Sequence, residues 1–483
     1  MEMQALERYR PIVDDPETFL ECSAAPLPIS VWTHPTRTTP QRLRQWMQQG
    51  AENLTVEPIR WYPGAFRLPG VTSPGNRVEF VAGLYHVQEE VSLLPPVLLD
   101  PRPGERVLDL CAAPGNKTAQ IALAVGPQGT VVANDRHYSR LAILRRNIDR
   151  LGLTNCVTTL FDAASYPKAC GLFDRVLADV PCSCEGTTRK FPTAGTGEGT
   201  LEPGQLASLQ TAILRRAVQL TRPGGRVVYS TCTYAPEENE AVVAAVLEHF
   251  PAGALRLLPA AIPGFRTAPG LTAWQGQPFP RELERALRVW PHHNDTGGFF
   301  AAVLEKRAEV GGEPEADHAS LEPLDDPEPW LVRLEERHGI ARARLEGYTL
   351  FRPSRKFLAL ANRGLRLPHR PEPVGIGIPL LRIDMNDPKL ASGAALLFGR
   401  EVDRNVLQVT RQQADAYARR ETFQAAAEQL AACPAGGHIL LRYQEAPLGI
   451  GRLQRTADGG GTMESLFPKA WAIGPGRSLF DWE

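Results

Sequence analysis

The sequence predicts an α/β protein whose mostly parallel β-sheet is covered by helices on both faces. Between about residues 100 and 306, short apolar stretches typical of strands alternate with stretches of helical spacing, and the connections leave no room for hairpins. Several of the apolar stretches end in or near an aspartate. The carboxyl ends of parallel strands meet at one edge of a sheet, which is where such sheets bind their ligands.

The individual elements follow from these stretches. The expected strands are 106–112, 129–136, 156–163, 173–180 and 226–234. They are short and apolar, as is typical of strands buried on both faces. The expected helices are 117–125, 139–153, 205–220 and 237–250. A Pro-Gly-Gly turn at 223–225 is expected between the third helix and the last strand.

Length and composition describe an ordinary globular chain. A chain of 483 residues favours about two to four domains, and its 43% hydrophobic and 22% charged residues are unremarkable. The N-terminus MEMQALERYR lacks an apolar signal core, and we find no apolar run of transmembrane length. We therefore expect a cytoplasmic protein, neither secreted nor membrane-spanning.

The flanks of the α/β segment differ from it in composition, which gives the expected organisation. We expect an N-terminal region at 1–100, a central domain at 101–307, an acidic linker at 308–330 and a C-terminal domain at 331–483. Within the last, residues 333–370 hold ten Lys or Arg against three Glu. The N-terminal region combines basic and aromatic residues that could bind phosphates and stack bases: Arg37, Arg42, Arg44, Arg60, Arg67, Trp46, Trp61 and Tyr62.

The eight cysteines show no metal-binding spacing. No CxxC pair occurs, and Cys182 and Cys184 alone cannot close a tetrahedral site, so we expect no metal. A reducing compartment argues against disulfides. The alternatives left for Cys182 are an ordinary buried thiol and a nucleophile.

Four aspartates stand near the expected strand ends: Asp109, Asp135, Asp162 and Asp179. An acidic residue after the second strand suits a ribose diol, yet neither GxGxxG nor a Walker A sequence is present. A nucleoside with an amino-acid tail, such as S-adenosylmethionine, fits better. The alternative is that these carboxylates only cap turns and helices.

Five blocks in order carry a family resemblance: YHVQEEVSLLPPVLLDPRPGERVLDLCAAPGNKTAQIA (85–122), ANDRHYSRL (133–141), DVPCSCEGTTRK (179–190), STCTYAPEENEAVV (230–243) and RVWPHHNDTGGFFAAVLEK (288–306). Together they resemble the Nop/Sun family of RNA (cytosine-5) methyltransferases. The resemblance implies a Rossmann-like methyltransferase domain that binds S-adenosylmethionine, flanked by a smaller N-terminal RNA-binding region and a C-terminal α+β or PUA-like appendage.

The resemblance also implies roles for individual residues. The cofactor-binding residues would be Cys111, Ala112, Ala113, Pro114, Gly115, Asn116, Lys117, Asp135, Arg140, Asp162 and Asp179, with Lys117 near the methionine carboxylate. Cys232 would be the nucleophile that attacks C6 of cytosine, Cys182 would assist its release, and Asp179 would orient the base. A free thiol is only slightly ionised at neutral pH, so we expect local activation of the nucleophile.

Two positions depart from the family pattern. Asn116 stands where APGGKT has its second glycine, which raises a question about the local backbone, and Cys184 stands where PCSG has glycine. We expect Cys184 to be a spectator, Cys111 to serve packing, and His292 and His293 to pack or cap rather than act.

The substrate stays open at this point. The ending MESLFPKAWAI (463–473) is similar to ribosomal-RNA members, whereas DVPCSCEGTTRK is closer to tRNA-modifying ones. We expect a monomer that acts on tRNA or rRNA. The alternatives are a catalytically silent RNA-binding protein of this fold, a methyltransferase for protein or small molecules, and a DNA cytosine-5 methyltransferase, whose Glu-Asn-Val and Gln-x-Arg-x-Arg motifs are missing.

Overall fold

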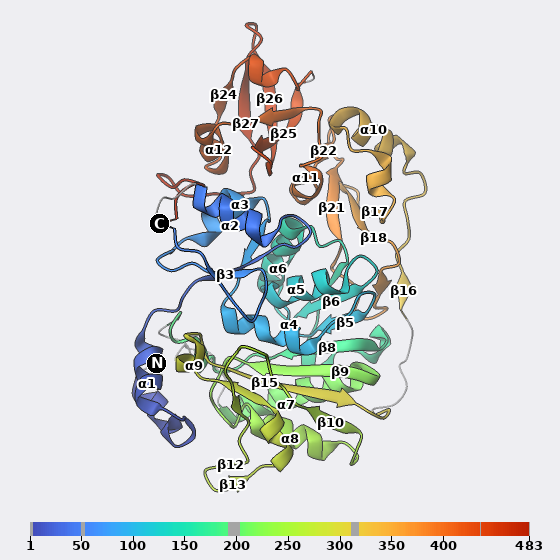
Figure 1. Cartoon of the computed structure of the whole chain (residues 1–483). Helices are drawn as coiled ribbons and strands as arrows, with labels where there is room; N and C mark the ends of the chain where they lie inside the picture. Colours follow the sequence, from blue (N-terminus) through green and yellow to red (C-terminus); the bar gives the residue numbers. More distant parts are fainter. Residues whose placement is uncertain (1–2, 50–53, 192–202, 311–317, 435, 483) are drawn as a thin grey trace.

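A computed structural model describes residues 3–49, 54–191, 203–310, 318–434 and 436–482. Its centre is the expected parallel sheet, in which five strands run side by side in the order β7-β6-β5-β8-β9 (Figure 1). Their bounds are β5 Arg106–Asp109, β6 Thr130–Asp135, β7 Cys156–Leu160, β8 Phe173–Asp179 and β9 Thr221–Thr231. The expected strands are therefore confirmed to within a few residues, apart from the start of β9.

Helices cover both faces of this sheet because successive strand residues point in opposite directions. Val107 of β5 packs in one apolar cluster and its neighbour Leu108 in another, and the same alternation holds for Val131 and Val132 of β6. The helices around the sheet are α4 Leu94–Leu99, α5 Asn116–Val125, α6 Tyr138–Leu151, α7 Pro203–Leu220 and α8 Glu240–His249. The first three contribute to the cluster of Val107, and the last two to that of Leu108.

Antiparallel strands extend the sheet beyond β9, and the sequence analysis missed them. β15 pairs antiparallel with β9, and β14 and β10 pair with β15. The strands of this extension are β10 Leu255–Leu258, β11 Ala268–Pro269, β14 Leu287–Val289 and β15 Phe299–Lys306. The same stretch of chain also holds a separate pair of strands, β12 Ala273–Trp274 and β13 Gln277–Pro278, and the helix α9 Pro291–Asn294. The turn expected at 223–225 lies within β9, where the pairing with β8 is irregular between Phe173 and Arg175.

The N-terminal region forms its own four-stranded antiparallel sheet, in the order β2-β3-β1-β4. Its elements are η1 Met3–Ile12, α1 Pro16–Ala24, β1 Ser30–Thr33, α2 Pro40–Gln49, β2 Glu57–Pro58, β3 Ala65–Arg67, η2 Pro74–Asn76, α3 Val78–Val81, β4 Tyr85–Val87 and η3 Glu90–Leu93. The chain then enters α4 and the central sheet.

The described part of the C-terminal region mixes helices with two larger sheets, ordered β17-β18-β21-β22 and β23-β25-β26-β27-β24, and a two-stranded sheet of β16 (Ala319–Ser320) and β19 (Arg366–Leu367). Its larger elements are α10 Glu328–His338, β17 Tyr348–Ser354, β18 Phe357–Asn362, β21 Ile378–Arg382, β22 Lys389–Leu390, α11 Ser392–Phe398, β23 Val406–Gln408, α12 Arg411–Ala418, β24 Phe423–Ala425, β25 Gly437–Tyr443, β26 Ala446–Arg455 and β27 Gly461–Ser465. The likeness to a PUA domain stays a prediction.

The terminal regions pack on each other and on the central domain. Residues of the N-terminal sheet, such as Val31 and Phe66, share an apolar cluster with Leu441 and Trp482 of the C-terminal region. In Figure 1, α2 and α3 of the N-terminal region lie directly below the C-terminal sheet of β24 to β27. A short strand, β20 (Gly375–Ile376), also extends the central sheet beyond β7. Among the described helices, none has the length and apolar character needed to cross a membrane.

Candidate active site

A cavity of about 710 Å³ opens at the carboxyl edge of the central sheet. Most of the residues that the sequence singled out surround it: Cys111, Ala113, Pro114, Asn116, Lys117, Asp135, Arg140, Asp162, Asp179, Cys182 and Cys232. Ala112 and Gly115 belong to the same loop but lie behind its lining. Gly115 has a φ of 103°, and a Cβ there would lie 2.5 Å from Leu144 Cδ1, so the loop packs against α6 only with glycine at this position.

The two cysteines expected to act together do converge. Cys182 follows β8 and Cys232 follows β9, and their Sγ atoms lie 3.4 Å apart. Backbone hydrogen bonds fix both strand ends, from Val180 N to Ser230 O at 3.1 Å and from Gly186 N to Cys232 O at 2.8 Å. The Sγ of Cys184 also points into this group and lies 3.9 Å from that of Cys182.

Neither of the two thiols is activated in the resting cavity. Hydrogen bonds with Cys184 and Cys232, and burial, raise the pKa of Cys182 well above its ordinary value. The contact with Cys182 lowers the pKa of Cys232, but Cys184, burial and the negative charge of Asp179 outweigh it and hold that pKa well above its ordinary value. The contacts with Cys182 and Cys232 instead lower the pKa of the neighbouring thiol, Cys184. The local activation of Cys232 that the sequence leads us to expect stays a prediction.

Asp179 is held at the edge of the cavity by two donors. Lys117 Nζ donates to Asp179 Oδ2 at 2.6 Å, and Ser230 Oγ donates to Oδ1 at 2.7 Å. Burial alone would lower the pKa of Lys117, but the Asp179 carboxylate outweighs it and raises that pKa, so the ammonium stays charged. The result is a fixed carboxylate–ammonium pair within the same cavity as the cysteines.

The other end of the cavity carries Asp135 and Arg140. Asp135 ends β6 with a buried side chain, and its Oδ1 accepts from His137 N at 2.9 Å. Arg140 Nη2 donates to Ala113 O at 2.7 Å and so braces the loop, and its Nε lies 3.8 Å from Asp135 Oδ2. Asp162 lines the cavity and also caps the turn that follows it, because its Oδ2 accepts from Ser165 Oγ at 3.1 Å.

Asp109 does not line the cavity, although it ends the first strand. Asp109 lies two residues after Val107 in β5, so the two side chains point to the same face of the sheet. The Asp109 carboxylate therefore points toward α5 and accepts from Thr118 Oγ1 at 2.7 Å. Burial raises the pKa of Asp109 to about 7. The expectation that all four strand-end carboxylates emerge at one rim is therefore wrong for Asp109.

Asn116 raises no backbone problem. It is the first residue of α5, while the left-handed conformation belongs to Gly115 before it. Its Oδ1 lies 2.9 Å from Nε2 of the buried His86. By contrast, Cys184 does adopt a left-handed conformation, with φ 59° and ψ 21°, which explains why glycine suits this position in the family pattern.

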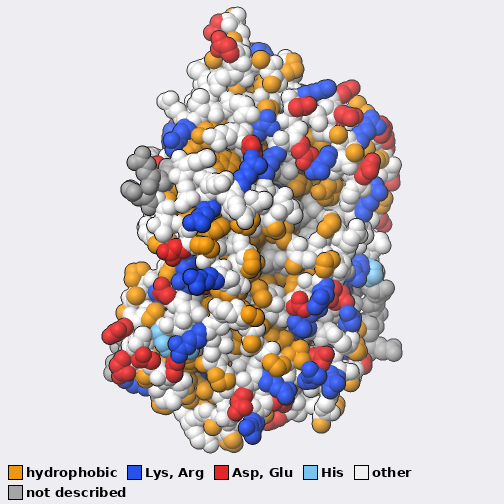
Figure 2. Space-filling view, viewed as in Figure 1, with side chains coloured by type: hydrophobic (Ala, Val, Ile, Leu, Met, Phe, Trp, Pro, Cys, Tyr) orange, Lys and Arg blue, Asp and Glu red, His pale blue; other side chains and the backbone are white. Residues whose placement is uncertain are grey.

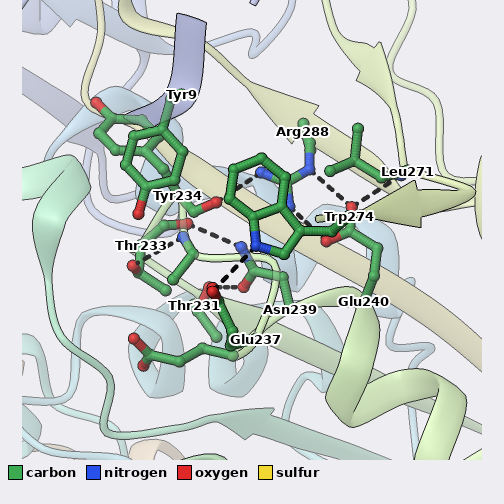
Figure 3. A network of polar contacts seen from close by, with 12 residues as sticks. Tyr9, Thr231, Thr233, Tyr234, Glu237, Asn239, Glu240, Leu271, Trp274 and Arg288 are labelled. Atoms are coloured by element: carbon green, nitrogen blue, oxygen red, sulfur yellow. Dashed lines mark hydrogen bonds and ion pairs between the residues drawn. The ribbon is translucent and has the colours of Figure 1, made fainter. Parts of the chain in front are cut away.

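A buried polar network supports the segment that follows Cys232, and the sequence analysis missed it (Figure 3). Thr231 Oγ1 donates to Asn239 Oδ1 at 2.6 Å, and Asn239 Nδ2 donates to Thr233 O at 3.0 Å. Arg288 forms an ion pair with Glu240, and its Nη1 donates to Tyr234 O at 2.8 Å. The only signal in the sequence is a run of polar residues at the start of an otherwise apolar helix.

His292 and His293 lie outside the cavity and contact the N-terminal segment instead. Their Nε2 atoms lie 2.9 and 3.0 Å from Asp14 Oδ1, and Arg266 pairs with Asp14 Oδ2 at 2.7 Å. The expected packing role agrees with these contacts. Cys156, Cys170 and Cys433 are buried, as ordinary core thiols are.

Several residues proposed to bind RNA are occupied by internal contacts. Arg37 Nη1 donates to Ala82 O and Arg150 O, both at 2.8 Å. Arg67 pairs with Glu90, which also accepts from Trp61 Nε1 at 2.7 Å. In the C-terminal region, four of the ten basic residues pair with carboxylates: Arg333, Arg337, Arg342 and Arg344. Figure 2 accordingly shows Lys and Arg interleaved with acidic side chains on this face.

Comparisons with known proteins agree with this geometry. A family model described as 16S rRNA methyltransferase RsmB/F matches residues 96–305. The chain is 34% identical to a tRNA (cytosine(49)-C(5))-methyltransferase of Pyrococcus abyssi, over 62% of this chain and 95% of that protein. It is 33% identical to ribosomal RNA small subunit methyltransferase F of Erwinia tasmaniensis, over 71% of this chain and 70% of that protein.

A solved structure shows the same fold. The crystal structure of a methyltransferase homologue from Pyrococcus horikoshii aligns with a TM-score of 0.54 and 31% identity, over 62% of this chain and 93% of that one. The chain spans only 39% of the length of two further curated relatives, from Drosophila melanogaster and Mus musculus.

Proposed function

The chain belongs to the RsmB/F (Nop/Sun) family of RNA (cytosine-5) methyltransferases, and we propose that it transfers a methyl group from S-adenosylmethionine to C5 of a cytosine in structured RNA. The observation that carries the proposal is the pair of thiols, Cys182 and Cys232, 3.4 Å apart in a cavity that also holds Asp179 and Lys117. Carbon 5 of cytosine is a poor nucleophile, so the reaction needs a thiol that bonds to the ring.

The residues of the cavity fit the cofactor. S-adenosylmethionine supplies an electrophilic methyl group when it is bound. The buried carboxylate of Asp135 at the end of β6 suits ribose hydroxyls, Asp162 in the cavity wall would face the adenine, and the loop before α5 would offer backbone N–H groups to the methionine end. A cavity of about 710 Å³ also lies within the usual range of ligand-binding cavities.

We assign the covalent step to Cys232. Its thiolate forms a bond to C6, the ring electrons shift to C5, and C5 would take the methyl group as the bond between that methyl and the sulfonium sulfur breaks, which leaves S-adenosylhomocysteine. A base then removes the C5 proton, the C6–S bond breaks, and the thiolate of Cys232 is restored. Cys182, whose sulfur lies 3.4 Å from that of Cys232, assists this release.

The Asp179–Lys117 pair orients the cytosine. A carboxylate accepts readily from the exocyclic amine of cytosine, and Asp179 is fixed for this by Ser230 and Lys117. The position of Lys117 favours a role beside the base over the contact with the methionine carboxylate that the resemblance implied. The target base has to leave its stack to reach this cavity, which loops and bulges in RNA make easier.

The specific RNA is a further part of the proposal, because the relatives include both tRNA and rRNA methyltransferases. Exposed arginines on both flanks, such as Arg44, Arg60 and Arg352, are available for phosphate contacts. The test is transfer of tritiated methyl groups to RNA from a deletion strain, with tRNA and ribosomal fractions separated, followed by bisulfite sequencing. We expect 5-methylcytosine to be lost at one defined position or a few, and an unchanged profile would refute the proposal.

A further inference from the structure

A third thiol beside the reacting pair, Cys184, has no role in the proposed reaction. It departs from the glycine of the family pattern, yet its Sγ points toward the two reacting cysteines rather than away from them. The Sγ atoms of Cys182, Cys184 and Cys232 all lie within 4.8 Å of one another. Two of the three separations are 3.4 and 3.9 Å, from Cys182 to Cys232 and to Cys184 respectively.

We propose that Cys182, Cys184 and Cys232 form a binding site for a thiophilic d¹⁰ cation, Zn²⁺ above all, and that the bound ion reversibly silences the enzyme. The binding itself does not depend on the proposed function, whereas the silencing does.

The spacing of the sulfurs suits such an ion. Zn²⁺ binds thiolates at about 2.3 Å in tetrahedral geometry, which places neighbouring sulfurs about 3.8 Å apart. The observed separations of 3.4 and 3.9 Å differ from this value by only a few tenths of an ångström.

The backbone presents the three sulfurs in advance. The left-handed conformation of Cys184 turns the chain back, so that its Sγ lies 3.3 Å from Cys182 O. The two loops that carry the thiols are also joined to each other. Ser183 Oγ lies 2.7 Å from Thr233 Oγ1, and Ser183 N donates to Glu238 Oε2 at 3.0 Å.

The site is open to the cavity on its remaining side. All three cysteines contribute to the cavity wall, so an ion can enter and a water molecule can complete its coordination. Three protein ligands with one open position are typical of accessible zinc sites. Because the ligands include both Cys232 and Cys182, an ion held there leaves no thiol for attack on cytosine.

The prediction from sequence that no metal binds rested on cysteine spacing along the chain. CxC cannot close a site alone, but Cys232 lies fifty residues beyond Cys182 in the sequence and meets it in space. The third ligand is particular to chains with cysteine at position 184, since a glycine there would leave only two thiols.

The test uses the reduced, full-length, metal-stripped protein, titrated with Zn²⁺ against a chromophoric chelator. Cys184→Ser keeps the side-chain size and removes the ligand, and Cys22→Ser serves as the matched control, because Cys22 is a partly exposed thiol outside the cavity. We expect one tight equivalent in the unmodified protein and in Cys22→Ser, and binding weaker by on the order of 100-fold in Cys184→Ser. Equal affinity in Cys184→Ser would overturn the proposal.

Two further measurements locate the ion and its effect. Titration with Cd²⁺ should produce the ultraviolet thiolate-to-metal absorption, with three cysteines protected from alkylation as read by peptide mass spectrometry. If Asp14→Ala, rather than Cys184→Ser, weakens binding, the ion occupies the histidine cluster and the proposal fails. Zn²⁺ should inhibit methyl transfer by the unmodified protein, and a chelator should restore the activity. The Cys184→Ser variant should be inhibited less by the same concentration of Zn²⁺. If the protein transfers no methyl group to any RNA, the proposed function fails, but the Zn²⁺ and Cd²⁺ titrations still show whether the three cysteines bind the ion.

Discussion

Two clusters of side chains in this molecule each bring three potential metal ligands together, but their surroundings differ. The cysteine cluster joins Cys182, Cys184 and Cys232, and the histidine cluster joins Asp14, His292 and His293. In the histidine cluster, both imidazole rings are buried, with 4% and 2% of their side-chain surface exposed, and both face one carboxylate that Arg266 also neutralises. The cysteine cluster instead faces a cavity of about 710 Å³.

The comparison shows that a cluster of ligand side chains can bind a substrate or an ion only where the side chains are not already paired and face an open cavity. In the histidine cluster each Nε2 already has a partner in Asp14, so the contacts fasten the N-terminal segment to the chain around α9. Arg266 beside the same carboxylate opposes a second cation there. In the cysteine cluster, the thiols have only weak partners, namely one another and the carbonyl oxygen of Cys182, and a substrate or an ion entering the cavity can replace them.

The largest effect should come from the carboxylate of the cavity. Asp179→Asn removes the charge that Lys117 and the cytosine amine contact, so we expect kcat/KM for RNA methylation to fall by about 100-fold or more. Asp14→Asn, in the histidine cluster, should change it less than about twofold. Comparable losses in both variants would place the histidine cluster in the active site and erase the distinction between the two clusters.

The next effect concerns stability and its pH dependence at Asp109. Burial raises the pKa of Asp109 to about 7 from an ordinary value of 3.8, so the folded state binds this proton more tightly than the unfolded state does. The contribution of Asp109 to stability is therefore fully present below pH 4 and is lost as the pH rises through 7.

Asp109→Asn should remove this dependence. We expect the variant to be more stable than the original chain by about 2 kcal/mol at pH 8, once the cost of a buried amide N–H is included, and no more stable at pH 4. Urea unfolding at both pH values measures this. A stability difference that stays constant between them would contradict the assignment of a protonated, buried carboxyl group.

A smaller effect of opposite sign is expected at Asp14. Burial alone would raise its pKa, but hydrogen bonds from His292 and His293 lower the pKa to about 2. Its stabilising contribution is then present above pH 4 and disappears as the pH falls through 2. Asp14→Ala should cost about 1 kcal/mol at pH 7, because the Asp14 carboxylate is half exposed to solvent, and almost nothing near pH 2.

The measurement is again urea unfolding, now with Asp15→Ala as the control. Asp15 is the neighbouring carboxylate and is held mainly by hydrogen bonds from Thr18, so the cost of its loss should depend much less on the histidines. The Asp14→Ala change is then repeated in a protein that also carries His292→Ala and His293→Ala. If it lowers the free energy of unfolding by the same amount there, contacts other than those with the histidines hold the N-terminal segment in place.

The sequence predicted the parallel sheet because each of its strands is a local apolar run between recognisable turns. It also placed Cys182 and Cys232 together, because neighbouring strand ends meet at one edge. The antiparallel strand β15 was missed because its partner β9 lies about seventy residues earlier, and periodicity carries no information on such pairing.

Side-chain direction is what the sequence analysis could not supply. Asp109 and Asp179 both end strands, yet one packs under Thr118 and the other borders the cavity, because their local surroundings differ. The direction of Cys184 depends on a positive φ that a cysteine rarely adopts. Likewise, Arg37 and Arg67 look like RNA-binding residues in the sequence, and only the tertiary structure reveals their internal partners.

The most direct test of the central claim is covalent capture of RNA by two cysteine variants. Cys182→Ala and Cys232→Ala are incubated with S-adenosylmethionine and the RNA fraction that accepts methyl groups, and the products are separated on a denaturing gel. We predict that Cys182→Ala accumulates a protein–RNA adduct, because attack still occurs and release fails, whereas Cys232→Ala forms none. An adduct with Cys232→Ala and none with Cys182→Ala would contradict the assignment of the nucleophile.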